Sequence, residues 1–264
     1  MVAKPAPASL IEYPVVESRQ VGAYRLISFV AREIAASAIP GQFLMVRQAG
    51  PSLDPLLPRP LGIHDIDSDL VRILIEPVGK GTYELVRLRV GDRLSVLGPL
   101  GNGFDPRGGG TALLVGGGIG VAPLALLARS LTASGRDVHC LLGFRTRSQA
   151  VSAELFREYY VKVFTEDASV GTRGLVSEPL SACLADNAGK RDEHATEVFA
   201  CGPDPMLREI ARIAEESGAR AQLSAAAHMA CGIGACQGCV VRTTGGYRRV
   251  CSEGPVFEAG ELIW

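Results

Sequence analysis

Four cysteines near the end of the chain have the type and spacing to hold a metal cluster. Cys231, Cys236 and Cys239 form the pattern C-x4-C-x2-C, and Cys251 follows. This is the plant-type spacing for a [2Fe–2S] cluster, in which four thiolates converge on a small inorganic core. A short loop supplies three of these thiolates only if its backbone folds tightly, which the interspersed glycines permit. We therefore predict that the four cysteines bind a [2Fe–2S] cluster.

Two other interpretations of these cysteines are a structural zinc ion and a disulfide pair. Zinc sites usually combine two C-x2-4-C knuckles, or one knuckle with histidines, and this run has no nearby histidine pair. The fourth thiolate is expected on the far side of a hairpin, because residues 240–243 and 247–250 flank a turn at Gly245 and Gly246.

The residues around the cysteines form a more specific motif than the generic cluster spacing. Residues 229–239 read Met-Ala-Cys-Gly-Ile-Gly-Ala-Cys-Gln-Gly-Cys, and residues 249–257 read Arg-Val-Cys-Ser-Glu-Gly-Pro-Val-Phe. This wording resembles the electron-transfer subunits of the two-subunit, NAD-dependent dihydroorotate dehydrogenases (class 1B) of bacteria and archaea, which are ferredoxin-reductase-like flavoproteins. The resemblance implies that the rest of the chain carries flavin and nucleotide motifs.

Length and composition set bounds on the class of protein. A chain of 264 residues holds two ordinary domains and a small appendage. With 27 basic and 28 acidic residues, the balance gives no electrostatic reason to bind nucleic acid. No signal peptide or membrane-length apolar run is recognisable, and seven cysteines favour thiol or metal chemistry. We expect a cytoplasmic protein with no membrane or nucleic-acid partner.

The first hundred residues read as short strands separated by turn signals. Runs at residues 24–30, 42–46, 71–75 and 93–97 are β-branched or alternating, and Gly, Pro or Asp bounds each of them. One or two helical turns are expected at residues 83–88. Strands this short and frequent predict an antiparallel β-barrel.

Two predicted loops in this barrel, residues 57–63 and 78–82, resemble the flavin-binding segments of ferredoxin-reductase-type proteins. The resemblance implies that Arg59 binds the FAD pyrophosphate, a role that suits its planar, permanently charged fork. The interpretation without a cofactor is that Arg-Pro forms an ordinary strand-entry turn. The remaining FAD-binding residues that the resemblance implies lie after Arg59, in the strand before the second loop and in that loop: Pro60, Leu61, Gly62, Leu74, Ile75, Glu76, Gly81 and Thr82.

The pattern changes after residue 111, where a continuous apolar run is followed by a glycine-rich turn and then by a helix expected at residues 121–133. A strand, a glycine loop and a helix N-terminus together make an anion site. The spacing does not match G-x-G-x-x-G, so a standard Rossmann dehydrogenase is disfavoured. The loop is instead similar to the pyridine-nucleotide loop of ferredoxin reductases, which implies that NAD(H) contacts Gly116, Gly117, Gly118, Gly120 and Pro123.

Further strands and helices alternate as far as a helix expected at residues 204–217, which predicts a parallel α/β sheet. The segments 165–167 and 171–174 follow one strand at the edge where such sheets bind ligands. By resemblance, Cys201, Gly202 and Pro203 lie beside the nicotinamide. The alternative is a helix start alone, with Asp204 as N-cap and Pro205 at the first helical position.

No residue is predicted to be catalytic. The histidines, His64, His139, His194 and His228, are scattered, and none pairs with a carboxylate or cysteine at a recognisable spacing. Arg145 and Arg147 follow the second strand of the sheet and leave NADPH open as an alternative to NADH.

The expected architecture has three parts. Residues 1–106 form an FAD-binding antiparallel β-barrel, residues 107–222 a Rossmann-like parallel α/β domain for NAD, and residues 223–264 a small [2Fe–2S] subdomain. The resemblance implies an electron-transfer subunit that works through FAD and the cluster with the FMN of a catalytic subunit, in a heterotetramer. The alternative function is a related reductase subunit that serves a ferredoxin, a hydrogenase or a sulfur-reducing partner.

Overall fold

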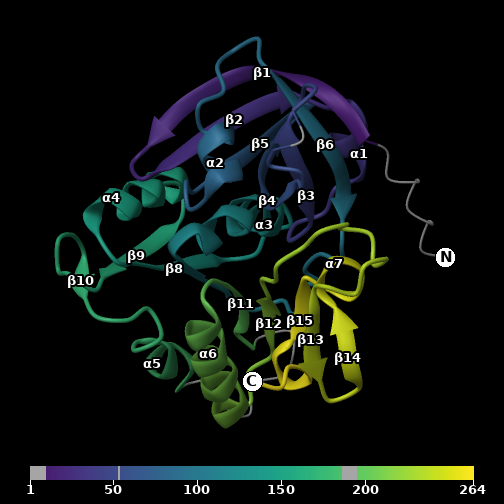
Figure 1. Ribbon diagram of the computed structural model, residues 1–264. Coiled ribbons are helices and arrows are strands. Elements are labelled where there is room, and N and C mark those ends of the chain that lie inside the picture. Colours follow the sequence, from purple (N-terminus) through teal and green to yellow (C-terminus); the bar gives the residue numbers. More distant parts are fainter. Residues whose placement is uncertain (1–9, 53, 186–194) are drawn as a thin grey trace.

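The computed structural model describes residues 10–52, 54–185 and 195–264. In Figure 1 the chain runs from a barrel into a twisted sheet with helices on its faces and ends in a segment that lies against both. No helix in the described ranges is long and apolar enough to cross a membrane.

The barrel closes in the strand order β1-β2-β5-β4-β3-β6, with all of its pairs antiparallel. Alternate residues point inward and form a core with Ile27, Phe29, Ile73 and Val96 at its centre. This confirms the predicted barrel. Its elements are β1 (Leu10–Val21), β2 (Tyr24–Val30), α1 (Arg32–Ser37), β3 (Phe43–Gln48), β4 (Arg59–Asp67), β5 (Leu70–Ile75), α2 (Lys80–Leu85) and β6 (Arg93–Leu100).

Three sequence predictions in the barrel were wrong in detail. Strand β1 was not predicted, and most of the predicted loop 57–63 is the start of β4. The prolines suggested a turn, but Pro60 is the second residue of β4, near a strand end where the sheet tolerates proline. Helix α2 begins at Lys80, earlier than expected, because the Thr82 hydroxyl accepts the backbone N–H of Gly79 and caps the first turn.

The second part is a seven-stranded sheet in the order β10-β9-β8-β7-β11-β12-β15. Helix α3 packs on one face, with Leu124 and Leu127 against β7 and β8, and helices α5 and α6 pack on the other. The elements are β7 (Ala112–Gly117), η1 (Gly118–Val121), α3 (Ala122–Ala133), β8 (Val138–Phe144), α4 (Arg147–Ala150), η2 (Val151–Phe156), β9 (Tyr160–Thr165), β10 (Thr172–Arg173), α5 (Leu180–Leu184), β11 (Glu197–Cys201), α6 (Asp204–Ser217) and β12 (Ala221–Ser224).

The sheet is parallel, as predicted, except at one edge. Strand β15 (Val256–Glu258) comes from the end of the chain and pairs antiparallel with β12. At the start of α6 the N-cap is Pro203, so Asp204 and Pro205 occupy the first two helical positions and the predicted Asp204 cap was wrong.

The C-terminal segment contains the hairpin β13 (Val240–Thr243) and β14 (Gly246–Arg249), then α7 (Val250–Glu253) and, after β15, η4 (Ala259–Glu261). The hairpin was predicted correctly, but its turn lies at Thr244 and Gly245, one residue earlier than expected. Cys251 lies in the short helix α7.

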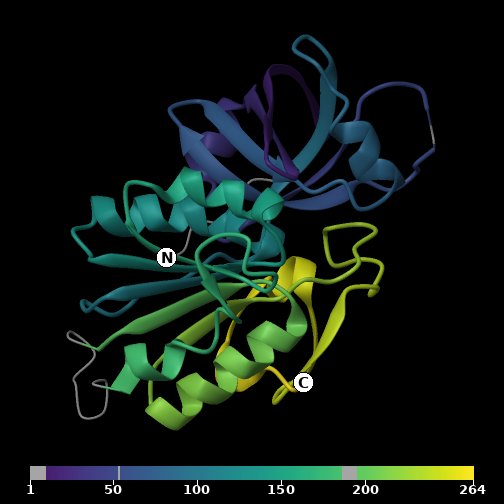
Figure 2. The same ribbon diagram turned by 90° about the vertical axis from the view of Figure 1, so that its left-hand side faces the viewer.

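The three parts pack closely on one another. Between barrel and sheet, His64 of β4 donates a hydrogen bond from Nδ1 to the Ala122 carbonyl oxygen of α3 at 2.9 Å, and Asp65 pairs with Arg129 of α3 at 3.0 Å. The C-terminal segment shares a core with the barrel, in which Phe43 and Met45 of β3 pack with the C-terminal residues. Figure 2 shows the barrel above the sheet, with the C-terminal segment beside the junction.

Candidate functional site

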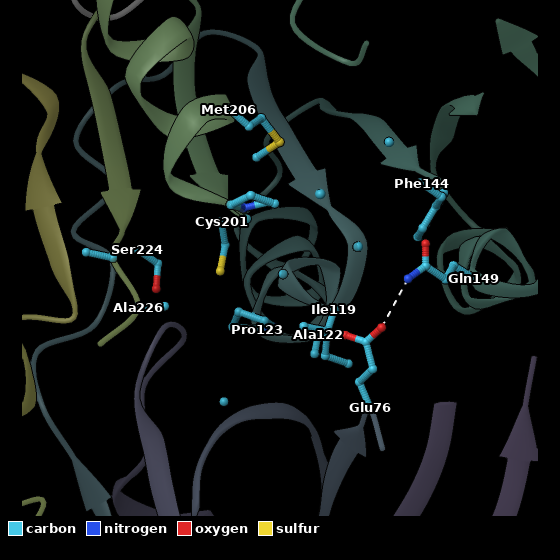
Figure 3. Close-up of a pocket in the computed structure, with 18 of the residues that line it drawn as sticks. Glu76, Ile119, Ala122, Pro123, Phe144, Gln149, Cys201, Met206, Ser224 and Ala226 are labelled. Carbon is cyan, nitrogen blue, oxygen red and sulfur yellow. Dashed lines mark hydrogen bonds between the residues drawn. The ribbon is translucent and has the colours of Figure 1, made fainter. Parts of the chain in front are cut away.

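A cavity of about 990 Å³ lies between the barrel and the carboxyl edge of the sheet. Figure 3 shows Glu76 reaching from the barrel toward Gln149 of α4, beside Ile119 of η1, with Cys201 at the end of β11 on another side of the cavity. Most of the residues predicted to bind FAD or NAD(H) line this one space, although they come from distant parts of the chain. They are Arg59, Pro60, Leu61, Gly62, Leu74, Glu76, Thr82, Gly117, Gly118, Gly120, Pro123, Cys201, Gly202 and Pro203.

Three predicted residues do not line the cavity. Ile75 points into the barrel core, because successive side chains of a strand face opposite sides and its neighbours Leu74 and Glu76 face the cavity. Gly116 is buried, and a Cβ there would lie 2.9 Å from Val121. Gly81 lies behind Arg59, where it lines a smaller cavity of about 230 Å³.

Arg59 stands between the two cavities and lines both of them. Its Nη1 donates a hydrogen bond to the Leu57 carbonyl oxygen at 2.6 Å, which fixes one end of the guanidinium. A Cβ on Gly81 would lie 2.5 Å from Arg59 Nε, so only glycine leaves room for the guanidinium in this position. The arrangement holds a permanently charged, bidentate donor at the junction, as a pyrophosphate requires.

The glycine loop after β7 approaches two other segments closely. A Cβ on Gly117 would lie 2.6 Å from Met206 Sδ, and one on Gly120 would collide with the Cys201 backbone. Gly118 has a positive φ of 56° and open space beside it. These glycines bring backbone without side chains to the cavity, together with η1, which leads into α3, and the helix dipole there favours an anion.

Cys201 lies at the end of β11 and faces the cavity near Ser224 (Figure 3). Burial raises the pKa of Cys201 to about 11, although a hydrogen bond with Ser224 acts in the opposite direction. The group is therefore a neutral thiol at neutral pH, suited to contact an uncharged ring.

Several residues that line the cavity were not predicted. Gln149 of α4 donates a hydrogen bond from Nε2 to Glu76 Oε1 of the barrel at 3.0 Å (Figure 3). Its position after β8 is at the carboxyl edge of the sheet, which was the available signal. The other residues not predicted come from β8, α6, the segment after β10 and the segment after β12, and include Phe144, Val176, Ser177, Met206, Ala225, Ala226, Ala227 and Met229.

The four predicted cluster cysteines come together in two pairs. The Cys236 N–H donates to Cys231 Sγ, and the Cys251 N–H donates to Cys239 Sγ. Cys239 and Cys251 are buried and Cys236 is exposed. Among the described residues no three His, Cys, Asp or Glu side chains gather as a single metal ion needs. Four thiols in two pairs are a donor set that suits a [2Fe–2S] core, which four cysteine sulfurs hold.

Backbone amides point at the cysteine sulfurs. The Gly234 N–H donates to Cys251 Sγ at 3.1 Å, and the Cys236 N–H donates to Cys231 Sγ at 3.4 Å. Burial acts to raise the pKa of Cys231, but the surrounding amides outweigh it and lower the pKa to about 6. Burial and the hydrogen bond with Cys239 raise the pKa of Cys251 to about 11. A loop rich in amide donors stabilises thiolates and bound sulfide.

Three of the histidines belong to the part of the chain that the structure describes. His64 is buried beneath α3, His139 contacts Tyr160 at the surface and His228 is exposed. None of these three lines the cavity. His194 lies outside the described residues.

Comparison with known proteins agrees with this geometry. The model for the iron–sulfur cluster binding domain of dihydroorotate dehydrogenase B matches residues 226–263. The chain is 39% identical to the dihydroorotate dehydrogenase B (NAD(+)) electron transfer subunit of Clostridium acetobutylicum, over 85% of this chain and 86% of that protein. It is 42% identical to the subunit from Bacillus caldolyticus over the same shares, and 38% identical to the one from Lysinibacillus sphaericus over 94% and 96%.

The fold is also similar to solved reductases. A structure of an NADH-dependent reduced ferredoxin-NADP oxidoreductase superposes with a TM-score of 0.80 at 27% identity, covering 96% of this chain and 90% of the other. A ferredoxin reductase of carbazole 1,9a-dioxygenase superposes with a TM-score of 0.68 at 23% identity, over 82% and 68%. The identity shared with the curated subunits, over most of both chains, shows that this chain belongs to the family of dihydroorotate dehydrogenase B electron-transfer subunits.

Proposed function

We propose that this chain is the electron-transfer subunit of an NAD-dependent dihydroorotate dehydrogenase and carries electrons between NAD(H) and a catalytic subunit through FAD and a [2Fe–2S] cluster. One observation carries the proposal. Phe43, Ala225 and Met229 line the large cavity and also pack in the core that contains Cys239 and Cys251. The cavity and the cysteines therefore share a wall, so electrons have a short path from one to the other.

For FAD, the two cavities that meet at Arg59 provide one space for each half of the molecule, with the pyrophosphate between them. Arg59 would hold the pyrophosphate, with Gly81 leaving room for the guanidinium and Thr82 shaping the loop beside it. The isoalloxazine would lie in the larger cavity against Leu61, Gly62, Leu74 and Glu76, and the adenosine in the smaller one. Bound FAD supplies the conversion of a two-electron hydride transfer into one-electron steps.

For NAD(H), the glycine loop and the start of α3 face the same cavity from the sheet. The nucleotide phosphates would contact the backbone of Gly117, Gly118 and Gly120. Pro123 packs closely against Gly62 of the barrel, because a Cβ added to Gly62 would lie 3.3 Å from it. The segment Cys201, Gly202 and Pro203 would border the nicotinamide. The neutral Cys201 thiol adds no charge beside that ring.

For the cluster, Cys231 and Cys236 form one thiolate pair and Cys239 and Cys251 the other. The amides of Gly234 and Cys236 would stabilise the negative charge of the reduced cluster. The curated relatives are named as electron transfer subunits of dihydroorotate dehydrogenase B, which supports a catalytic subunit as the partner. We further propose that this partner carries FMN, that the assembly is a heterotetramer and that it works in the cytoplasm.

The division of labour along the chain is part of the proposal. Residues 1–106 bind FAD, residues 107–222 bind NAD and residues 223–264 hold the cluster. The last boundary passes through β12, whose residues run from Ala221 to Ser224. Strand β15 belongs by sequence to the cluster part and by pairing to the sheet.

A second candidate function is a reductase subunit that serves a ferredoxin or another electron carrier. It is favoured by the similarity to a ferredoxin-NADP oxidoreductase over 96% of this chain. The higher identity to the dihydroorotate dehydrogenase B subunits supports the first candidate.

Anaerobic co-expression with the catalytic subunit of the same organism tests the proposal. We expect one complex with flavin and iron–sulfur absorption, in which NAD-dependent orotate formation requires both chains. A coloured, NADH-oxidising protein that neither binds the catalytic subunit nor supports this reaction would favour the second candidate. A colourless protein with bound zinc would contradict both.

A further inference from the structure

Gln149 bridges the barrel and the sheet across one end of the large cavity. Its Nε2 donates to Glu76 Oε1 at 3.0 Å, and its Oε1 accepts the backbone N–H of Arg145 at 3.1 Å. Glu76 follows β5 of the barrel, whereas Arg145 follows β8 of the sheet. One amide side chain therefore ties the flavin side of the cavity to the nucleotide side.

The surroundings make this bridge a fixed point. Gln149 is 9% exposed, so its amide is largely shielded from competing water. Beside it, the Ala23 N–H of the β1–β2 turn donates to the Ser148 carbonyl oxygen at 2.8 Å. Tyr24 is fully buried in the same interface, and its hydroxyl has no hydrogen-bond partner among the residues that the structure describes. The two parts meet here through buried polar groups and tight packing.

The bridge borders the cavity itself. Glu76, Arg145 and Gln149 all line it, and Figure 3 shows the Glu76 side chain turned from the barrel toward Gln149 and Phe144. A ring bound against Leu74 and Glu76 would lie on one side of the hydrogen bond, and a nucleotide on the glycine loop would lie on the other. A change in this contact alters the separation of the two ligands, on which hydride transfer depends steeply.

We propose that Gln149 is a positioning residue for hydride transfer, which sets the distance between the flavin and nucleotide sides of the cavity by holding Glu76. The proposal rests on the proposed function and goes beyond it, because Gln149 belongs to no phosphate or flavin motif. The role needs a donor on one side chain and an acceptor on the other. It does not matter which of the two side chains donates and which accepts.

An exchange of the two side chains tests this directly. Gln149→Glu alone places two carboxylates face to face, and Glu76→Gln alone leaves two amides. In the double variant, the carboxylate introduced at position 149 accepts from the Arg145 N–H and from the new amide at position 76, so the bridge reforms with its polarity reversed. Ser148→Ala is the matched control, because Ser148 is exposed and contributes its backbone carbonyl to the interface.

The measurement is anaerobic stopped-flow reduction of the flavin by NADH, with ferricyanide turnover, FAD content and cluster absorbance recorded in parallel. In this reaction NADH loses a hydride to become NAD⁺, two ferricyanide ions take one electron each to become ferrocyanide, and the proton is released to solvent. We expect Gln149→Glu and Gln149→Ala to slow reduction by about tenfold or more, the loss expected for a hydrogen bond to a charged group. FAD content, cluster absorbance and the Ser148→Ala rate should stay unchanged, and the double variant should recover to within about threefold of the wild type.

Two outcomes would overturn the proposal: an unaltered reduction rate in Gln149→Glu, or a double variant as slow as the slower single variant while FAD and cluster are retained. Failure of the proposed function gives a different result, since the wild-type protein would then lack flavin or fail to oxidise NADH. A Gln149→Glu protein that loses its FAD would assign the residue to folding, and this too would overturn the proposal.

Discussion

Arg59 and Gly81 act as a unit, because the position of the guanidinium depends on the missing side chain of the glycine. The Leu57 carbonyl oxygen fixes Arg59 from one side and the Gly81 backbone limits it from the other. Neither residue has this role alone. A short motif around Arg59 is thus completed by a glycine from the first turn of helix α2.

We expect Gly81→Ala to weaken FAD binding by about tenfold or more, as displacement of a charge-assisted contact implies. The new Cβ would meet Arg59 at 2.5 Å and push the guanidinium off the junction. Gly79→Ala is the control, since a Cβ there meets nothing within 4 Å. Fluorescence titration of the apoprotein with FAD measures both. Equal affinity in the two variants would show that Arg59 tolerates displacement.

At this scale the sequence predicted residue types better than orientations. The cysteine spacing and the glycine loop identified groups that the structure brings together, because both patterns depend on local backbone geometry. Ile75 was included with Leu74 and Glu76, although strand alternation turns it into the barrel core. Gln149 had no recognisable pattern, because its partner Glu76 lies 73 positions away.

The cluster loop and helix α7 are joined at the element scale by Arg249. Its Nη1 donates to the Gly234 carbonyl oxygen at 3.1 Å, and its Nε donates to Glu253 at 2.9 Å. Gly234 in turn donates its N–H to Cys251. Arg249 therefore holds the loop segment whose amide faces one of the cysteine sulfurs.

In the Arg249→Met variant we expect the cluster absorption to bleach severalfold faster in air and the reduction potential of the cluster to fall. The reason is that the Gly234 amide is then free to turn away from the Cys251 sulfur. Arg248→Met is the matched control, since Arg248 lies near the hairpin turn at Gly245. Visible absorption against time and a redox titration followed by electron paramagnetic resonance measure the two effects. Identical bleaching and titration curves for the two variants would show that Arg249 does not hold the Gly234 amide in place.

Elements with strong periodicity were predicted nearly to the residue. Strand β2 and helix α6 have the bounds expected at residues 24–30 and 204–217, because an apolar pattern and flanking Gly or Pro mark each of them. Strands β4 and β15 were not predicted. The first has a proline at its second position and the second has only three residues, so tertiary pairing decides both.

The contact between barrel and sheet carries a pH dependence through His64. Burial lowers the pKa of His64 below its ordinary value of 6.5, and the hydrogen bond to the Ala122 carbonyl offsets this only in part. The unfolded chain therefore binds a proton at a higher pH than the folded protein does. Well above pH 6.5, His64 is neutral in both states and does not affect the free energy of unfolding. As the pH drops below about 6.5, the unfolded state gains a proton first and the protein becomes less stable.

We expect the urea midpoint of the wild type to fall between about pH 7.5 and 5.5, before carboxylates with ordinary pKa values titrate. His64→Asn keeps a donor for the Ala122 carbonyl but does not titrate, so its midpoint should fall less over the same interval. Parallel denaturation series at several pH values measure the difference. Parallel curves would place the pH dependence elsewhere.

Strand β15 gives the molecule a constraint on the order of its synthesis. The strand at the edge of the nucleotide sheet lies at Val256–Glu258, and the four cysteines precede it in the chain. Domains generally fold from the N-terminus as a chain is made, so the barrel can form while the ribosome still holds the last strand. The sheet is completed only after the cysteine loop has emerged. The four cysteines are therefore synthesised before the strand that completes the sheet beside them.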